Sequence, residues 1–312
     1  ADSEGIYVDY GATAENYGTI NVNGAGRTGI YLGTDGVLLN KGTINLSGGA
    51  DGVITGSGSL TNVGDITING PTASIDGITI TNTGTINLTG DTSIGMYTED
   101  FAIGTSTGHV SVGDKSAAYY AGTDGTMNIS GTASVGEDSS LLFGAGGTIN
   151  YTGADIVMSN KSIALTLSDL ASSVDFNTRE VTTGTEGTGI FLTGTGDISK
   201  VTNLAKLNVH NKATGIFMDN NVALNTGMAI NIIGTEAIGV FTTNNGNINY
   251  SGNMSSSTIK NKGIINTGTG ITVNSGTIKL TGDSSIGMYG ENGTMINNSS
   301  IEAGNGAYFD EL

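Results

Sequence analysis

The amino-acid sequence predicts an all-β protein, and more specifically a parallel β-helix of about 13 stacked coils. Three observations indicate this fold: a repeat along most of the chain, apolar residues that alternate with polar ones inside each repeat, and Gly- and Asn-rich turns between the alternating segments. A repeat of roughly 20–50 residues is typical of a solenoid, because so small a unit cannot bury its own apolar face and must stack on its neighbours.

The repeat is clearest in two phrases that lie far apart. Residues 82–97 read NTGTINLTGDTSIGMY, and residues 274–289 read NSGTIKLTGDSSIGMY. The small residue before Met recurs in most cases at steps of 23 to 26 residues, and the glycine of Asn-x-Gly-x-Ile-Asn recurs with similar spacing. Two phrases in a fixed order mean that each repeat holds at least two ordered segments. The small-residue markers are Gly5, Gly29, Gly52, Gly77, Gly95, Ala118, Leu141, Ala164, Gly189, Gly215, Gly239, Gly263 or Gly270, Gly287 and Gly306.

Within each repeat the apolar residues have the period of a β-strand. Ile86 and Leu88 flank Asn87, and the same alternation recurs at equivalent places in other repeats. Alternation over two residues places one set of side chains on the inner face of a strand. Ile, Val, Thr and Tyr favour strands, whereas Gly and Asn favour turns. A β-propeller, the rival repeat fold, needs about 40–50 residues per repeat, which does not match this period.

Composition and charge limit the partners. The chain of 312 residues has a formal net charge of −17 and no Cys. The acidity argues against nucleic acid and against an anionic membrane surface, because both attract basic patches. Repulsion between like-charged molecules, which favours solubility, is the simpler explanation of the charge. No apolar run is long enough to span a bilayer, and the sequence predicts neither a disulfide nor a cofactor.

The repeat is interrupted once. We expect a single β-helical domain over residues 1–312, with an insertion or an irregular coil at 155–186, where turn glycines are missing. Ser168 or Asp169 would suit the N-cap of a short helix there, and a degenerate coil is the equal alternative. Residues 307–312 stop at the start of another copy of the repeat, so we expect the chain to be part of a longer protein.

Several phrases also carry a family resemblance. The phrases are Ser-Ile-Gly-Met-Tyr at 93–97 and 285–289, Thr-Gly-Ile-Phe at 188–191 and 214–217, and Asn-Lys-Gly-Thr-Ile-Asn-Leu at 40–46. They resemble the passenger repeats of the giant fusobacterial autotransporters, type V secreted outer-membrane adhesins of the RadD kind. The resemblance implies a right-handed β-helix held outside the cell by a C-terminal membrane barrel that this chain does not contain. It also implies binding to host-cell proteins, galactose-type sugars or partner bacteria.

Three features suggest chemistry, and each has a simpler explanation. Residues 24–29 read GAGRTG, the dinucleotide-binding pattern, but a strand follows where that motif needs a helix. Asp100 and Asp124 lie in successive repeats and are weak calcium candidates, although solvated turn acids are the simpler interpretation. A carbohydrate-active enzyme would need paired acids or a base in a cleft, and neither His109 nor His210 has a partner in phase. We therefore expect no enzyme activity, no catalytic residue and no metal.

Two columns of equivalent residues give sharper expectations. Asn16, Asn40, Asn62 and Asn82 recur in successive coils on the inner side, so their amides are expected to stack as a hydrogen-bonded ladder. The second column is an outward file of aromatic rings, which either turns cover or a ligand contacts. The file comprises Phe191, Phe217 and Phe241, with a second file of Tyr97, Tyr120 and Phe143. The residues expected inside beside these files are Ile94, Met96, Ile190, Leu192, Ile238 and Val240.

These expectations combine into one functional hypothesis. The chain is predicted to be a cell-surface adhesin segment on the extracellular face of the bacterial outer membrane. A stiff β-helix would display loops that bind host-cell receptors, glycans or other bacteria, with Phe191, Phe217 and Phe241 as candidate binding residues. A β-helical carbohydrate-active enzyme and a purely structural spacer are the alternatives.

Overall fold

The computed structural model describes residues 4–24, 28–47, 51–55, 58–69, 74–76, 79–219, 222–243 and 245–304. These residues form parallel β-strands stacked as a β-solenoid of about 11 turns, close to the number expected, and the predicted fold class is confirmed. Across these ranges the only helical segment is the short 3-10 turn η1 (Ile198–Lys200), so none of the described residues form a helix able to cross a membrane. The chain divides into two compact units, residues 1–154 and 155–312.

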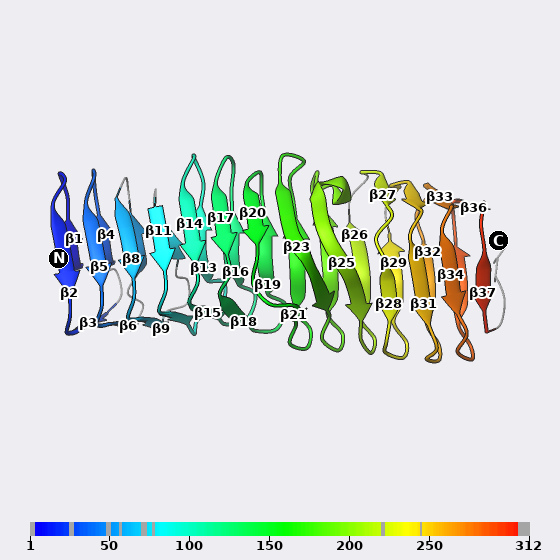
Figure 1. Ribbon diagram of the computed structural model, residues 1–312, viewed down its shortest axis with the longest axis horizontal. Helices are drawn as coiled ribbons and strands as arrows, with labels where there is room; N and C mark the ends of the chain where they lie inside the picture. Colours follow the sequence, from blue (N-terminus) through cyan, green and yellow to red (C-terminus); the bar gives the residue numbers. More distant parts are fainter. Residues whose placement is uncertain are drawn as a thin grey trace. The chain divides into compact units, whose positions relative to one another are not determined.

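In the first unit, each turn except the last, which holds β19 (Ser140–Gly144) and β20 (Thr148–Tyr151), passes through three walls of parallel strands, and each strand pairs with its equivalents in the neighbouring turns (Figure 1). Wall 1 contains β1 (Glu4–Val8), β4 (Thr28–Leu32), β7 (Asp51–Thr55), β10 (Ser74–Asp76), β13 (Ile94–Thr98), β16 (Ala117–Ala121) and β19 (Ser140–Gly144). Wall 2 contains β2 (Thr13–Asn16), β5 (Val37–Asn40), β8 (Ser59–Asn62), β11 (Thr79–Asn82), β14 (Ile103–Ser106), β17 (Thr126–Ile129) and β20 (Thr148–Tyr151). Wall 3 contains β3 (Thr19–Asn23), β6 (Thr43–Ser47), β9 (Asp65–Asn69), β12 (Thr85–Leu88), β15 (His109–Val112) and β18 (Thr132–Val135).

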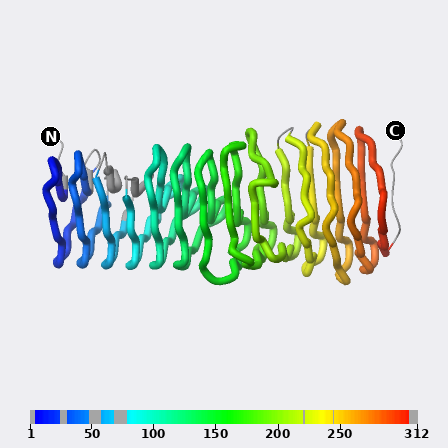
Figure 2. Tube along the Cα trace, turned by 45° about the horizontal axis from the view of Figure 1, so that its top comes forward, coloured from blue at the N-terminus to red at the C-terminus, as the bar shows by residue number. Residues whose placement is uncertain are grey.

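The second unit is also built from stacked parallel strands, and Figure 2 traces its successive turns. Wall 4 contains β22 (Ile163–Leu167), β24 (Thr188–Thr193), β26 (Thr214–Asp219), β29 (Ile238–Thr242), β32 (Lys262–Asn266) and β35 (Ile286–Gly290). Wall 5 contains β23 (Ser173–Thr182), β25 (Val201–Val209), β28 (Ile230–Ile232), β31 (Asn253–Ser256), β34 (Thr277–Leu280) and β37 (Ile301–Ala303), with β21 (Ile156–Val157) paired to β23. Wall 6 contains β27 (Leu224–Thr226), β30 (Ile248–Tyr250), β33 (Ile271–Asn274) and β36 (Thr294–Asn297).

The chain visits the walls of the two units in different orders. In the first unit, the strand of wall 3 follows that of wall 2, whereas the strand of wall 6 comes between those of walls 4 and 5. Before wall 6 begins, β23 and β25 are unusually long, with ten and nine residues, and their pairing contains register shifts. Asn177 and Thr178 have positive φ at the irregularity. The long strand β23 and its shifted pairing with β25 explain why the repeat is hard to follow at 155–186.

The irregular stretch is strand and turn rather than helix. Residues 155–186 contain β21, β22 and β23. The Oδ1 of Asp169 accepts a hydrogen bond from the N–H of Ala171 at 2.7 Å, but this bond closes a turn that leads into β23 and does not cap a helix. The proposed helix cap at Ser168 or Asp169 was therefore wrong, because the local Asx turn leads into a strand.

Alternation of buried and exposed side chains matches the predicted strand phase. Ile44 and Leu46 of β6 are fully buried, and Asn45 between them is half-buried. In wall 1, Ile30 and Leu32 are fully buried on either side of half-buried Tyr31. The core of each unit is thus built from Ile, Leu, Val and Met side chains, several from each turn, and their burial stabilises the solenoid.

The marker residue of the repeat is small because it faces another turn's backbone. A Cβ built on Gly215 would lie 2.5 Å from the carbonyl oxygen of Gly239, and one on Gly189 would lie 2.6 Å from the carbonyl oxygen of Gly215. At such distances the backbone itself must shift, so these glycines are sterically required. The glycine of the Asn-x-Gly phrase is constrained in the same way, since a Cβ on Gly42 would overlap the carbonyl oxygen of Gly18.

The marker residue faces the interior, and this changes which of its neighbours are buried. Gly95 and Met96 are both buried, so two consecutive residues of β13 face inward and Ile94 is only half-buried. In β29, Ile238 is half-buried for the same reason, while Val240 is fully buried. The placement of Ile94 and Ile238 inside was therefore wrong, because strict alternation fails at the marker residue. Residues 25–27 of the GAGRTG pattern and residues 307–312 at the end of the chain lie outside the described residues.

Candidate functional site

The asparagine ladder predicted from the sequence is present inside the first unit. The Nδ2 of Asn16 donates to Oδ1 of Asn40 at 2.8 Å, Asn40 donates to Asn62 at 2.8 Å, and Asn62 donates to Asn82 at 2.9 Å. Asn40, Asn62 and Asn82 are completely buried. Each amide also donates toward a backbone carbonyl, such as that of Thr85 for Asn62 at 3.2 Å. A buried ladder of this kind fixes the register of the turns, since a shift would leave buried amides unpaired.

The aromatic file of the second unit faces outward, as predicted. Phe191, Phe217 and Phe241 are register partners on β24, β26 and β29, and all three are half-buried. Their ring centroids are 5.3 and 5.4 Å apart with interplanar angles of 14° and 15°. Ile190 and Leu192, on either side of Phe191, are buried as expected.

Stacking determines what this file offers to a ligand. The two faces of the Phe217 ring are covered by Phe191 and Phe241, and the outer faces of those two rings look toward the register positions of Thr166 and Ile265. The Phe217 ring therefore offers only its edges to solvent. A sugar or an aromatic ligand that stacks on a ring needs an open face, so the file is better explained as a stabilising stack. Ligand binding to this file stays a prediction.

The file of the first unit has the same geometry. Tyr97, Tyr120 and Phe143 stack at 5.0 and 4.9 Å and are half-buried. The phenol of Tyr97 donates to the carboxylate of Glu99, two residues along the strand. Partial burial raises the pKa of Tyr120 above its ordinary value, with nearby Glu99 adding to the effect. The stack therefore combines ring contacts with a hydrogen bond at its rim.

The candidate calcium ligands are exposed turn residues. Asp100 and Asp124 both have positive φ, at 49° and 58°, and they follow β13 and β16 respectively in successive turns. Their backbone N–H groups donate to Thr123 and Gly146, which fixes the turns without using the carboxylates. In the part of the chain that the structure describes, no group of three or more His, Cys, Asp and Glu side chains is placed to hold a metal ion.

Neither histidine side chain has a carboxylate hydrogen-bond partner within the described ranges of the chain. The Nδ1 of His109 is 2.9 Å from Oγ1 of Thr132, at the surface of wall 3. The Nδ1 of His210 is buried without a hydrogen-bond partner among the described residues. The arrangement around His109 can orient the ring but gives it no carboxylate partner, and a base of that kind needs one for strong catalysis.

Alternating charges occupy one turn column of the second unit. Glu186, Lys212, Glu236 and Lys260 each lie two residues before a strand of wall 4, and all have positive φ. Lys212 is 3.9 Å from Glu186, and Lys260 is 3.4 Å from Glu236. Because these pairs are exposed, each contributes little to stability. The alternation nevertheless disfavours turns stacked out of order, since like charges would then meet.

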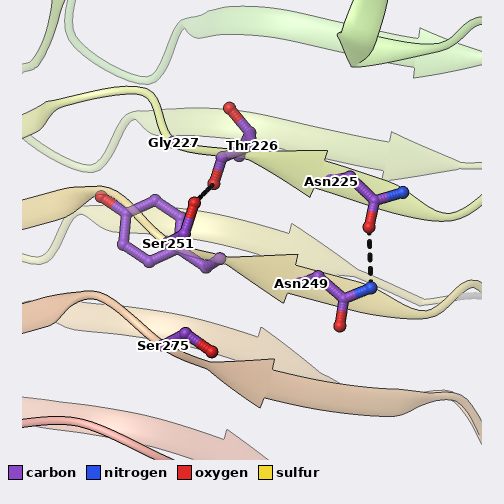
Figure 3. A pocket seen from close by; sticks show the side chains of 7 residues that line it. Asn225, Thr226, Gly227, Asn249, Ser251 and Ser275 are labelled. Carbon is purple, nitrogen blue, oxygen red and sulfur yellow. Dashed lines mark hydrogen bonds between the residues drawn. The ribbon is translucent and has the colours of Figure 1, made fainter.

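A polar groove lies on the outer surface of wall 6, and the sequence reasoning missed it. The groove has a volume of about 300 Å³ and spans β27, β30 and β33 at their C-terminal ends. Figure 3 shows the amide pair Asn225 and Asn249 on one side and the hydroxyls of Ser251 and Ser275 on the other. The sequence does carry a signal, because Asn225, Asn249 and the two serines recur at steps of 24 residues. The sequence alone did not predict wall 6, so it gave no reason to expect these residues on one surface.

A second groove of about 430 Å³ lies along wall 5 of the same unit. Its lining includes Asn231, Ser255 and Lys279, which are register partners in successive turns, and the exposed side chain of Ile233. Lys279 forms an ion pair with Glu302 at 3.0 Å. This groove is thus mixed in character, with one paired charge and two isoleucines, Ile232 and Ile233, in its lining.

Comparison with known proteins gives one partial match. Residues 2–53, which are 52 of the 312 residues, match the family described as the BigA third pectate lyase-like domain. No curated protein and no solved structure matches the chain. The match and the β-solenoid are consistent with a β-helical segment of an adhesin-like bacterial surface protein.

Proposed function

We propose that the chain is an adhesive segment of a bacterial surface protein, exposed on the outer membrane as the β-helical passenger of a type V secreted autotransporter. The observation that carries the proposal is the combination of a β-solenoid with a match to a BigA pectate lyase-like domain over residues 2–53. The repeat phrases support the finer assignment to the fusobacterial RadD-like family. The segment is not proposed to be an enzyme.

The mechanism is display. Strand pairing and apolar stacking hold the turns to their neighbours, and a ladder of buried amides adds to this in the turns of Asn16, Asn40, Asn62 and Asn82. The outer surfaces of the walls therefore have fixed geometry. A ligand that contacts several turns then meets side chains repeated at about 4.8 Å, the spacing of adjacent strands. Host-cell proteins, glycans and partner bacteria are the proposed classes of ligand. The net charge of −17 favours partners that are neutral or basic over acidic ones.

A structural spacer is the second candidate, and one observation favours it. In the aromatic file of Phe191, Phe217 and Phe241, which was the candidate binding strip, the rings stack on one another, so both faces of Phe217 are covered. A chain that only separates other domains needs such internal stabilisation and no ligand groove.

Cell binding separates these candidates. Fluorescently labelled chain is titrated onto intact epithelial cells, lymphocytes and bacteria, with a thermally unfolded sample of the same chain as the control. The adhesin proposal predicts saturable binding to at least one cell type that unlabelled chain displaces. Binding no greater than that of the unfolded control on every cell type would reject adhesion in favour of the spacer.

A further inference from the structure

The groove of wall 6 is lined by uncharged residues. Its floor is formed by Tyr250, which is fully buried and whose hydroxyl donates to the carbonyl oxygen of Met228 at 3.0 Å. Burial raises the pKa of this phenol well above its ordinary value, so it stays neutral. None of the other lining residues ionises, because they are Asn, Thr, Gly and Ser.

The rim presents donors and acceptors that the protein itself does not use up. The Nδ2 of Asn249 donates to Oδ1 of Asn225 at 2.7 Å, which orients both amides (Figure 3). Among the described residues, Nδ2 of Asn225 and Oδ1 of Asn249 have no further partner, so one donor and one acceptor remain at the two ends of the pair. The hydroxyl of Ser251 donates to the carbonyl oxygen of Thr226 at 3.3 Å, which leaves its oxygen as an acceptor. Ser275 adds a hydroxyl in the next turn.

This chemistry selects among ligand classes. An anionic ligand would need Lys or Arg in the groove, and a cation would need carboxylates, and neither type lines it. A peptide strand would add to a sheet edge or need apolar pockets. The groove lies instead across the face of β27, β30 and β33, which are paired with one another, and β27, the edge strand of wall 6, contacts η1. A neutral ligand with several adjacent hydroxyls can both donate to Asn249 and accept from Asn225. The volume lies at the small end of ligand sites, which suits about one or two sugar rings.

We propose that the groove of wall 6, between the amide pair Asn225–Asn249 and the hydroxyls of Ser251 and Ser275, is a binding site for an uncharged saccharide. The inference rests on the proposed adhesive function and assigns part of it to one surface. The amide pair contacts hydroxyls of the sugar, and the serines contact the same ring or the next one across the groove.

The test uses the full 312-residue chain and a panel of neutral oligosaccharides together with their sialylated counterparts. Binding is measured by ligand-observed NMR and then by calorimetry for each sugar that binds. Two variants alter the groove: Asn249→Ala removes one amide, and Ser275→Tyr fills the space. The matched control is Asn45→Ala, which breaks the equivalent surface amide pair Asn45–Asn21, 2.9 Å apart, on wall 3 of the first unit.

The proposal predicts that a neutral saccharide binds saturably and that its affinity changes little with salt, because no ion pair forms. Asn249→Ala is expected to weaken binding at least tenfold and Ser275→Tyr to abolish it, while Asn45→Ala binds like the parent chain. Circular dichroism confirms that each variant is folded. The inference is overturned if no neutral member binds, which leaves only a water-filled groove, if only sialylated members bind, or if binding survives both groove variants.

The same variants keep this inference separate from the proposed function. If Asn249→Ala and Ser275→Tyr bind cells as the parent chain does, adhesion stands and the groove is not its site. If the parent chain binds a saccharide through the groove but no cell type, the groove inference stands and the adhesion proposal fails.

Discussion

Replacing Asn62 by leucine tests how the turns are held in register. The side chain is completely buried, accepts from Asn40 at 2.8 Å, and donates to Asn82 at 2.9 Å and to the carbonyl oxygen of Thr85 at 3.2 Å. Leucine has a similar size but satisfies none of these groups. The Oδ1 of Asn40 still accepts from Asn16 at 2.8 Å, but its Nδ2 keeps only long hydrogen bonds to the carbonyl oxygens of Gly42 and Asp65, at 3.2 and 3.4 Å.

The expected cost follows from the groups left unpaired. A buried polar group that loses its partner costs about 1–3 kcal/mol, and the apolar burial of the leucine side chain offsets part of this loss. We therefore expect Asn62→Leu to lower the free energy of unfolding by about 1–3 kcal/mol. In a chain of this size, that corresponds to a fall in melting temperature of roughly 2–10 °C.

Urea and thermal unfolding followed by circular dichroism provide the assay. Asn45→Leu is the matched control, because Asn45 has the same amide pairing with Asn21 but at the surface, and its replacement should cost less than about 0.5 kcal/mol. If Asn62→Leu and Asn45→Leu unfold at the same urea concentration, the buried ladder does not stabilise the solenoid and the reasoning is wrong.

Further predictions concern the marker glycine, the ring stack, the turn charges and the buried phenols. Gly215→Val should destabilise by at least about 2 kcal/mol, since its Cβ would lie 2.5 Å from a carbonyl oxygen, whereas Gly18→Ala, with open space around the Cβ, should change unfolding little. Phe217→Ala, which removes two ring contacts, should cost more in a melting experiment than Phe191→Ala, which removes one; equal losses would argue against stacking. Glu236→Lys places three lysines in successive turns, so its melting temperature should fall at low salt and recover at high salt, and a salt-independent loss would contradict the charge column. Burial raises the pKa of Tyr119 and Tyr250 in the folded chain, so the contribution of these phenols to stability should be constant from neutral pH to about pH 10, the ordinary tyrosine pKa, and should fall above it as the unfolded phenols ionise. A melting temperature unchanged up to about pH 11 would refute this assignment.

Much of the fold was predictable because equivalent residues recur in every turn of the repeat. The Asn ladder and the outward direction of Phe191 followed from period-two alternation combined with the repeat length, and the structure confirms both. The alternation failed at Ile94 and Ile238, because the small marker residue after each also faces inward. A carbonyl oxygen of the next turn requires that residue to be small, and this contact between turns is invisible in one strand's pattern.

The candidate site was less predictable. Phe191, Phe217 and Phe241 were visible as a file, but whether their faces are open depends on ring orientation, which the residue pattern does not determine. The groove residues Asn249 and Ser275 looked like ordinary turn chemistry. They share a surface because wall 6 enters between walls 4 and 5, a change of path that follows the long strands β23 and β25.

The central claim is that equivalent residues of successive turns lie side by side, which both holds the chain together and builds its outer surfaces. The chain contains no cysteine, so pairs of introduced cysteines test it directly. Asn21→Cys combined with Asn45→Cys joins register partners in adjacent strands, about 4.8 Å apart, which lies within the range of a disulfide. Asn225→Cys combined with Asn249→Cys does the same in the second unit. Asn21→Cys combined with Ser47→Cys is out of register by two residues, at roughly 8 Å, beyond that range. Mass spectrometry after mild oxidation should find a disulfide in the two register pairs and free thiols in the third, whereas equal cross-linking of all three pairs would contradict the account.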